Sequence, residues 1–253
     1  MLNKKIMFLF LLIVYIIFPI KYYAEQITVM TEEWPPYNYT KSNKLTGFST
    51  EIVRAIMKRL GVEYKIYVYP GARGEFYAKT KPNHLLFSIF RIPARESIYK
   101  WIGPLASENI YFFKMKDKNI KATALGEIIN MDYTVMASHE GFVLNSLINK
   151  GVINIDKSAS STETKIKVLA QGRGDLIPFT ELGVRYILKK SHMPLNTLVN
   201  TKIKLASFYL YIAASKLTDD HIIKQWQEAL NSIKQEGEFQ KIYNRYLNYN
   251  SSY

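Results

Sequence analysis

Two arginines follow one apolar stretch of the chain. The run 85–90 has the length of a covered strand rather than of a helix, and Arg91 comes directly after it. A turn at Pro93 then brings Arg95 to the carboxyl end of that strand, the edge where open α/β sheets bind ligands. A guanidinium suits a carboxylate because its planar fork donates two parallel hydrogen bonds and stays charged. Arg95 is therefore a candidate carboxylate-binding residue; a local pair with Glu96 is the structural alternative.

Other candidate binding residues follow neighbouring strands. Arg73 comes shortly after a strand predicted for 62–69 that ends at Tyr69, and a surface role for this cation stays open. Trp34 follows a strand predicted for 26–31, and the Pro-Pro pair after it holds the backbone extended. A stiff loop that presents an aromatic ring suits stacking on a ligand, and packing within the protein is the alternative.

One turn in the second half is a candidate anion site. Gly141 and Phe142 lead into a helix predicted for 143–149. The free N–H groups at a helix amino terminus favour an anionic oxygen. Many helices begin this way, so the turn alone is weak evidence.

The order of elements predicts an α/β protein in two halves. A strand, the helix 50–60 and a second strand form a βαβ unit. The charged stretch 116–121 suits a crossing into a second half, where strands and helices alternate again. After an apolar strand at 205–214, amphipathic helices at 219–233 and 239–247 have no strand left to cover, so we expect them to pack on the first half.

Composition restricts the class of protein. The chain of 253 residues carries a net charge of +13, but its Lys and Arg are spread in ones and twos between acids. Without a basic run or a nucleic-acid motif, no nucleic-acid partner is expected. At the amino terminus, two lysines precede an apolar run at 6–18 and a plausible cleavage site after Ala24. This predicts a signal peptide at 1–24; an uncleaved anchor is the alternative, because Tyr22 is large for that site.

The residue patterns give no support for an enzyme. The four histidines are far apart in sequence, there is no cysteine, and neither a Gly-x-Ser-x-Gly elbow nor a phosphate-binding loop is present. We therefore expect no catalytic residue, no metal site and no cofactor.

Several motifs, in order, resemble the bacterial extracellular solute-binding proteins of family 3. The likeness runs from about Ile27 to Leu247. Its motifs are Trp34-Pro-Pro-Tyr-Asn-Tyr39, Gly47-Phe-Ser-Thr-Glu-Ile52, Pro93-Ala-Arg95 followed by Trp101-Ile-Gly-Pro104, Gly172-Arg-Gly-Asp175, and Gly237-Glu-Phe-Gln-Lys-Ile-Tyr243.

This resemblance implies a type 2 periplasmic-binding-protein fold: two lobes, each a mostly parallel sheet flanked by helices, joined by a two-strand hinge. Lobe 1 would comprise 25–108 and 206–253, and lobe 2 would comprise 109–205. The implied protein is a periplasmic monomer that captures a small carboxylate-bearing solute, an amino acid or a related molecule, and delivers it to the membrane permease of an ABC transporter. A sensory binding module and, less favoured, a dehydratase-type enzyme are the alternatives.

The resemblance also implies roles for individual residues. Arg95 falls on the arginine that holds the ligand carboxylate, and Trp34 on the aromatic that stacks against the ligand. Ser88 and Phe90 fall on the strand end that offers backbone groups, and Gly141-Phe142 on the N–H donors of lobe 2. Arg73, Arg91 and Tyr69 complete the predicted surroundings.

One departure bears on the ligand. The acid that normally receives the ammonium of an amino acid falls on Thr180, with Glu181 one residue away. A desolvated ammonium without a counter-charge costs several kcal/mol. The sequence therefore favours a carboxylate-bearing solute more strongly than an amino acid as such.

Overall fold

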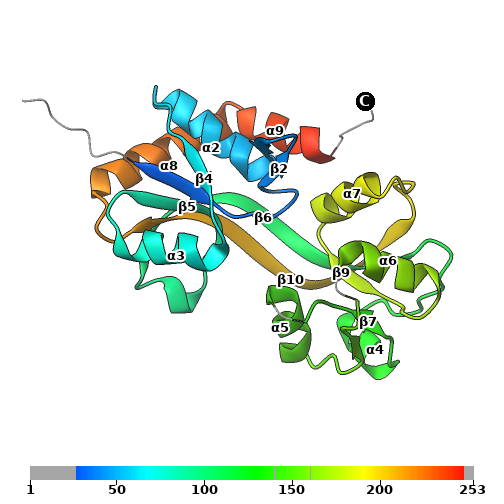
Figure 1. The fold of residues 1–253 in the computed structure, drawn as a ribbon. Helices are drawn as coiled ribbons and strands as arrows, with labels where there is room; N and C mark the ends of the chain where they lie inside the picture. Colours follow the sequence, from blue (N-terminus) through cyan, green and yellow to red (C-terminus); the bar gives the residue numbers. More distant parts are fainter. Residues whose placement is uncertain (1–26, 140, 160, 248–253) are drawn as a thin grey trace, which may run out of the picture.

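The structure is a computed structural model that describes residues 27–139, 141–159 and 161–247. The predicted signal peptide, 1–24, lies outside these residues. Strands and helices alternate through most of the described chain, as the sequence predicts (Figure 1).

One mixed sheet of six strands runs through the molecule in the order β4-β1-β5-β10-β6-β9. Its strands are β1 (Thr28–Thr31), β4 (Ile66–Val68), β5 (His84–Phe90), β6 (Tyr99–Met115), β9 (Ile177–Phe179) and β10 (Leu198–Ser215). β1 is parallel to β4 and β5, whereas β10 is antiparallel to β5 and β6, and β6 is antiparallel to β9. The parallel pairs put several strand ends at one edge, where loops can meet a ligand.

Two smaller sheets flank this one. The hairpin strands β2 (Tyr39–Lys41) and β3 (Lys44–Thr46) pair with each other. The short strands β7 (Val135–Met136) and β8 (Ile155–Asp156) are parallel, and Val135 also forms a bridge to Leu176 just before β9. Through this bridge β7 and β8 extend the far end of the six-stranded sheet.

The helices gather into two groups, which we call lobe 1 and lobe 2 (Figure 1). Lobe 1 holds α2 (Phe48–Arg59), α3 (Gly71–Thr80), α8 (Asp220–Gln235) and α9 (Glu238–Leu247). Lobe 2 holds α4 (Leu125–Asn130), α5 (Phe142–Asn149), α6 (Thr162–Ala170) and α7 (Glu181–Lys190). The long strands β6 and β10 run side by side from one group to the other, and the predicted lobe boundaries at 108/109 and 205/206 fall within them.

The carboxyl-terminal helices pack on lobe 1, as predicted. α8 begins at its N-cap Asp219, whose carboxylate accepts a hydrogen bond from the His221 N–H, and it buries Trp226 and Leu230. The ring of Phe48 in α2 meets Tyr243 in α9 edge to face, with centroids 5.5 Å apart.

Three element boundaries are not evident from the local sequence. α3 begins at Gly71, so Arg73, which comes shortly after the strand predicted for 62–69, lies in the first turn of a helix. β10 begins at Leu198 rather than near 205 as predicted, and its partner β6 already begins at Tyr99. Pairing between the two long strands overrides the local preference of a segment that contains Pro104, because each strand supplies the hydrogen bonds of the other.

Candidate functional site

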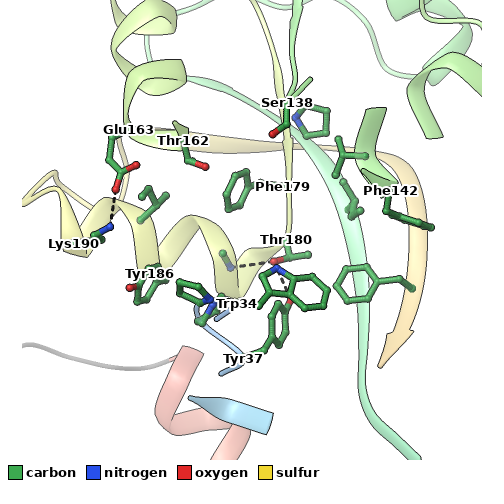
Figure 2. Close-up of a pocket in the computed structure, with 18 of the residues that line it drawn as sticks. Trp34, Tyr37, Ser138, Phe142, Thr162, Glu163, Phe179, Thr180, Tyr186 and Lys190 are labelled. Atoms are coloured by element: carbon green, nitrogen blue, oxygen red, sulfur yellow. Dashed lines mark hydrogen bonds and ion pairs between the residues drawn. The ribbon is translucent and has the colours of Figure 1, made fainter. Parts of the chain in front are cut away.

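A pocket of about 450 Å³ lies between the two lobes. This volume falls within the range of small-molecule sites. Lobe 1 contributes Trp34, Tyr37 and Phe90, and lobe 2 contributes Ser138, Phe142, Phe179, Thr180 and Tyr186; Phe208 of β10 completes the aromatic lining (Figure 2).

Aromatic rings from the two lobes meet in this pocket. Phe90, at the end of β5, stacks on Phe142, the first residue of α5, with centroids 5.0 Å apart and planes inclined by 21°. Trp34 meets Phe90 edge to face at 5.3 Å, and Phe208 does so from β10 at the same distance. Such aromatic pairs contribute stabilisation beyond that from burying the area of each ring. A flat apolar ligand can take the place of one ring in such a pair.

A tight turn positions the aromatic residues of lobe 1. The Tyr37 N–H donates to the Trp34 carbonyl at 2.9 Å, and the Trp34 N–H donates to the Asn38 carbonyl at 2.6 Å. Tyr37 is 2% exposed, and burial raises the pKa of its hydroxyl well above the usual value. Its hydroxyl lies 3.3 Å from the Thr180 hydroxyl, which makes a polar contact between the lobes.

Thr180 is already engaged within the protein. It is the N-cap of α7, where its hydroxyl accepts the Gly183 N–H at 3.0 Å. Glu181, the next residue, does not line the pocket; its Oε1 accepts a hydrogen bond of 2.5 Å from the Asn200 side chain. The pocket therefore receives an engaged hydroxyl from Thr180 and no carboxylate from Glu181.

The polar residues of the pocket come mainly from lobe 2. Ser138 follows β7, and its hydroxyl accepts a 2.6 Å hydrogen bond from the Lys165 ammonium of α6. Lys165 is only 6% exposed, and burial lowers its pKa. At the opposite rim, Lys190 and Glu163 form an ion pair at 2.9 Å (Figure 2).

The predicted cations of lobe 1 do not line this pocket. Arg95 donates to Glu75 of α3 at 2.6 Å and to the Phe90 carbonyl at 3.3 Å, and its side chain is 24% exposed. Its partner is thus Glu75 and not Glu96. Arg91 instead forms two hydrogen bonds with Glu96, at 2.7 and 3.0 Å.

The remaining predicted residues divide into two groups. Trp34, Phe90, Phe142 and Thr180 line the pocket, and Gly141 is the N-cap residue of α5 next to it. Arg73, Tyr69, Ser88 and Glu181 do not line it. The binding roles of all these residues, that of Arg95 included, stay predictions.

Sequence reasoning missed Lys165, Ser138 and Phe208. No motif includes them, and their roles depend on contacts between elements far apart in the chain. It also missed Glu108 of β6, which is 5% exposed and lies near Tyr243 and Glu181. Burial raises the pKa of the Glu108 carboxyl to about 7.

Two features are absent from the described residues. Within 27–139, 141–159 and 161–247, no group of three or more His, Asp or Glu side chains could hold a metal ion. Over the same part of the chain, no helix combines the length and apolar character needed to cross a bilayer.

The architecture is that of a class of binding protein: a mixed α/β sheet, two lobes and two long connecting strands form the type 2 periplasmic-binding-protein fold. Residues 27–249 match the model of the bacterial extracellular solute-binding proteins, family 3, and the chain belongs to that family.

Similar proteins agree with this assignment. The probable amino-acid-binding protein YxeM of Bacillus subtilis (strain 168) is 24% identical over 84% of this chain and 80% of its own. The arginine-binding periplasmic protein of Mannheimia haemolytica is 26% identical over 88% of this chain and 92% of its own. Among solved structures, the probable amino-acid ABC transporter extracellular-binding protein ytmK of Bacillus subtilis superposes with a TM-score of 0.74 at 14% identity, covering 88% of this chain and 98% of its own.

Proposed function

We propose that this protein captures a small carboxylate-bearing solute between its lobes and delivers it to the membrane permease of an ABC transporter. The observation that carries the proposal is the pocket lined by aromatic side chains from both lobes, with Phe90 facing Phe142 across it. The family and the amino-acid-binding relatives support it. Periplasmic location, the predicted signal peptide at 1–24 and a monomeric state belong to the same proposal.

Capture depends on contacts that exist only when the lobes are together. A solute that touches Trp34 on one lobe and Phe142 on the other favours the closed arrangement by the difference between its contacts in the two states. A shift from mostly open to mostly closed requires about 5.5 kcal/mol of such difference. Desolvated aromatic contacts together with one charge-assisted hydrogen bond are of this order.

A ligand screen tests this proposal. Thermal unfolding of the protein would be measured with amino acids, monocarboxylates, dicarboxylates and short peptides. A solute present at 100 times its Kd stabilises the folded state by about 2.7 kcal/mol, so a true ligand raises Tm clearly. If no solute of these classes raises Tm, the proposed function is wrong.

A matched pair of variants tests whether the pocket is the binding site. Phe142→Ala removes a ring from the pocket, whereas Ile148→Ala removes an apolar side chain from the exposed side of the same helix, where Ile148 is 56% exposed. We expect at least tenfold weaker binding for Phe142→Ala and no change for Ile148→Ala. Equal affinities for the two variants would remove the pocket as the site.

A further inference from the structure

We infer that Lys165 and Ser138 bind the anionic group of the solute, so that lobe 2 holds the carboxylate and the aromatic rings hold an apolar body. This inference rests on the proposed function and deepens it. It assigns a ligand class, an aryl or other apolar monocarboxylate, and a specificity-determining cation that no motif in the sequence indicates.

The first argument is the burial of Lys165 without a counter-charge. The residue is 6% exposed, and its ammonium donates to the Ser138 hydroxyl at 2.6 Å. Among the residues that the structure describes, no carboxylate oxygen lies within 4.0 Å of its ammonium. A buried ammonium is unfavourable unless it is paired, which agrees with the lowered pKa of Lys165. An incoming carboxylate would supply the missing pair.

The second argument is position. Ser138 lines the pocket and follows the carboxyl end of β7, the strand edge at which α/β sheets bind ligands. Thr162, the first residue of α6, lines the same pocket, and Lys165 lies one turn further along this nine-residue helix. The positive end of the helix dipole and the Lys165 ammonium therefore act on one place.

The third argument is the charge balance around the pocket. The Lys190 ammonium at the rim is paired with Glu163 at 2.9 Å. In lobe 1 the Arg95 guanidinium is paired with Glu75 at 2.6 Å. Lys165 does not itself line the pocket, but its ammonium donates to the Ser138 hydroxyl, which does. Of these three cations, Lys165 is the one without a carboxylate partner among the described residues. A single negative charge on the ligand restores neutrality.

The lining also argues against a zwitterion. The one acid that lines the pocket, among the described residues, is Glu163, and it is occupied by Lys190. A ligand ammonium would find aromatic rings and hydroxyl groups but no unpaired carboxylate among the described lining residues, and the hydroxyls of Thr180 and Tyr37 are engaged with each other. An apolar monoanion meets the lining better than an amino acid does.

Three probes of similar shape test the ligand class by isothermal titration calorimetry. They are 3-phenylpropanoate, which is a monoanion, L-phenylalanine, which adds an ammonium, and 3-phenylpropan-1-ol, which lacks the charge. We expect the monoanion to bind the full protein at least tenfold more tightly than the other two. Absence of binding by 3-phenylpropanoate, or equal affinity for the alcohol, would overturn the inference.

Two lysine variants on one helix test the cation. Lys165→Met should weaken 3-phenylpropanoate binding at least tenfold and leave the alcohol unaffected, whereas Lys167→Met, which alters an exposed residue, should change neither. Unchanged binding of the acid by Lys165→Met would overturn the inference. If Phe142→Ala loses the ligand while Lys165→Met keeps it, the proposed function stands and the role of Lys165 falls.

A measurement without ligand separates binding from a structural role. Because an unpaired buried charge opposes folding, Lys165→Met should raise the Tm of the free protein, and the more conservative Lys165→Gln should not lower it. A lower Tm for both variants would show that Lys165 is needed for the fold, and would contradict the assignment.

Discussion

Arg95 in lobe 1 is partly buried and Lys165 in lobe 2 is almost fully buried, but within the described part of the chain only Arg95 has an acidic partner. Arg95 donates to Glu75, and the nearby Glu32 carboxyl has its pKa raised by burial and by the charge of Glu75. Among the described residues, the Lys165 ammonium donates to the Ser138 hydroxyl alone. Around Arg95, therefore, two acids lie near one cation, whereas Lys165 has no acid beside it among the residues that the structure describes.

This difference shows that residue type and strand position do not settle which cation meets a ligand. A cation already paired within the protein must exchange its partner for the ligand, and the exchange leaves a carboxylate behind. A cation without an acidic partner can bind the ligand carboxylate without leaving a protein carboxylate unpaired. The comparison therefore favours lobe 2 as the holder of the anionic group, and the variants below test it.

The largest expected effect concerns a third buried charge, Glu108 on β6. Its pKa rises from 4.5 to about 7 on folding, so the unfolded chain loses this proton at a lower pH than the folded protein does. Below about pH 4.5 the group therefore carries no penalty; the penalty grows between pH 4.5 and 7, and above pH 7 it reaches roughly 3 kcal/mol as an upper limit.

The variant Glu108→Gln removes this ionisation while keeping an acceptor for the Tyr243 hydroxyl. We expect its free energy of unfolding to exceed that of the wild type at pH 8, with little difference at pH 4.5, as measured by urea denaturation. Glu228→Gln on α8, an exposed position, is the control. A pH-independent difference would show that burial of Glu108 does not shift its titration.

An intermediate effect is expected for Arg95→Met. The change leaves Glu75 without its cation and should lower the free energy of unfolding by about 1 kcal/mol, since the pair is partly exposed. In the same variant, 3-phenylpropanoate titration tests the predicted role of Arg95 as carboxylate receptor. Binding lost with Arg95→Met and kept with Lys165→Met would reverse the comparison between the lobes.

The smallest effect is expected for Arg91→Met. Its partner Glu96 is 46% exposed, and exposed ion pairs contribute about 0–1 kcal/mol. The Arg91 guanidinium also lies over the Trp101 ring, 5.6 Å from its centroid. The expected loss of stability in Arg91→Met therefore includes a small loss of this contact. A fall in Tm larger than that of Arg95→Met would show that exposure does not rank these two arginines.

The order of elements could be predicted, but the lengths of the connecting strands could not. The alternation of strands and helices and the docking of α8 and α9 on lobe 1 follow from apolar periodicity. The amino-terminal half of β6 carries Gly103 and Pro104, which locally disfavour a strand. Its pairing with β10 decides the outcome, and that pairing joins segments about a hundred residues apart.

The candidate site was predictable where a rigid local motif carries it. Trp34 beside two prolines, Phe90 at a strand end and Phe142 at a helix start all line the pocket. Lys165 was not predictable, because it and Lys167 are two similar lysines on one amphipathic helix. Only the packing of α6 on lobe 2 buries the first and exposes the second.

The central claim, capture between two lobes, can be measured as a distance. The chain contains no cysteine, so spin labels at Lys79→Cys on α3 and Lys150→Cys after α5 would report only the separation of the lobes. Pulsed electron–electron double resonance measures the distance between the two labels. We expect the distribution of this distance to narrow to one population when the solute that most raises Tm is added. An identical distribution with and without that solute would contradict the account.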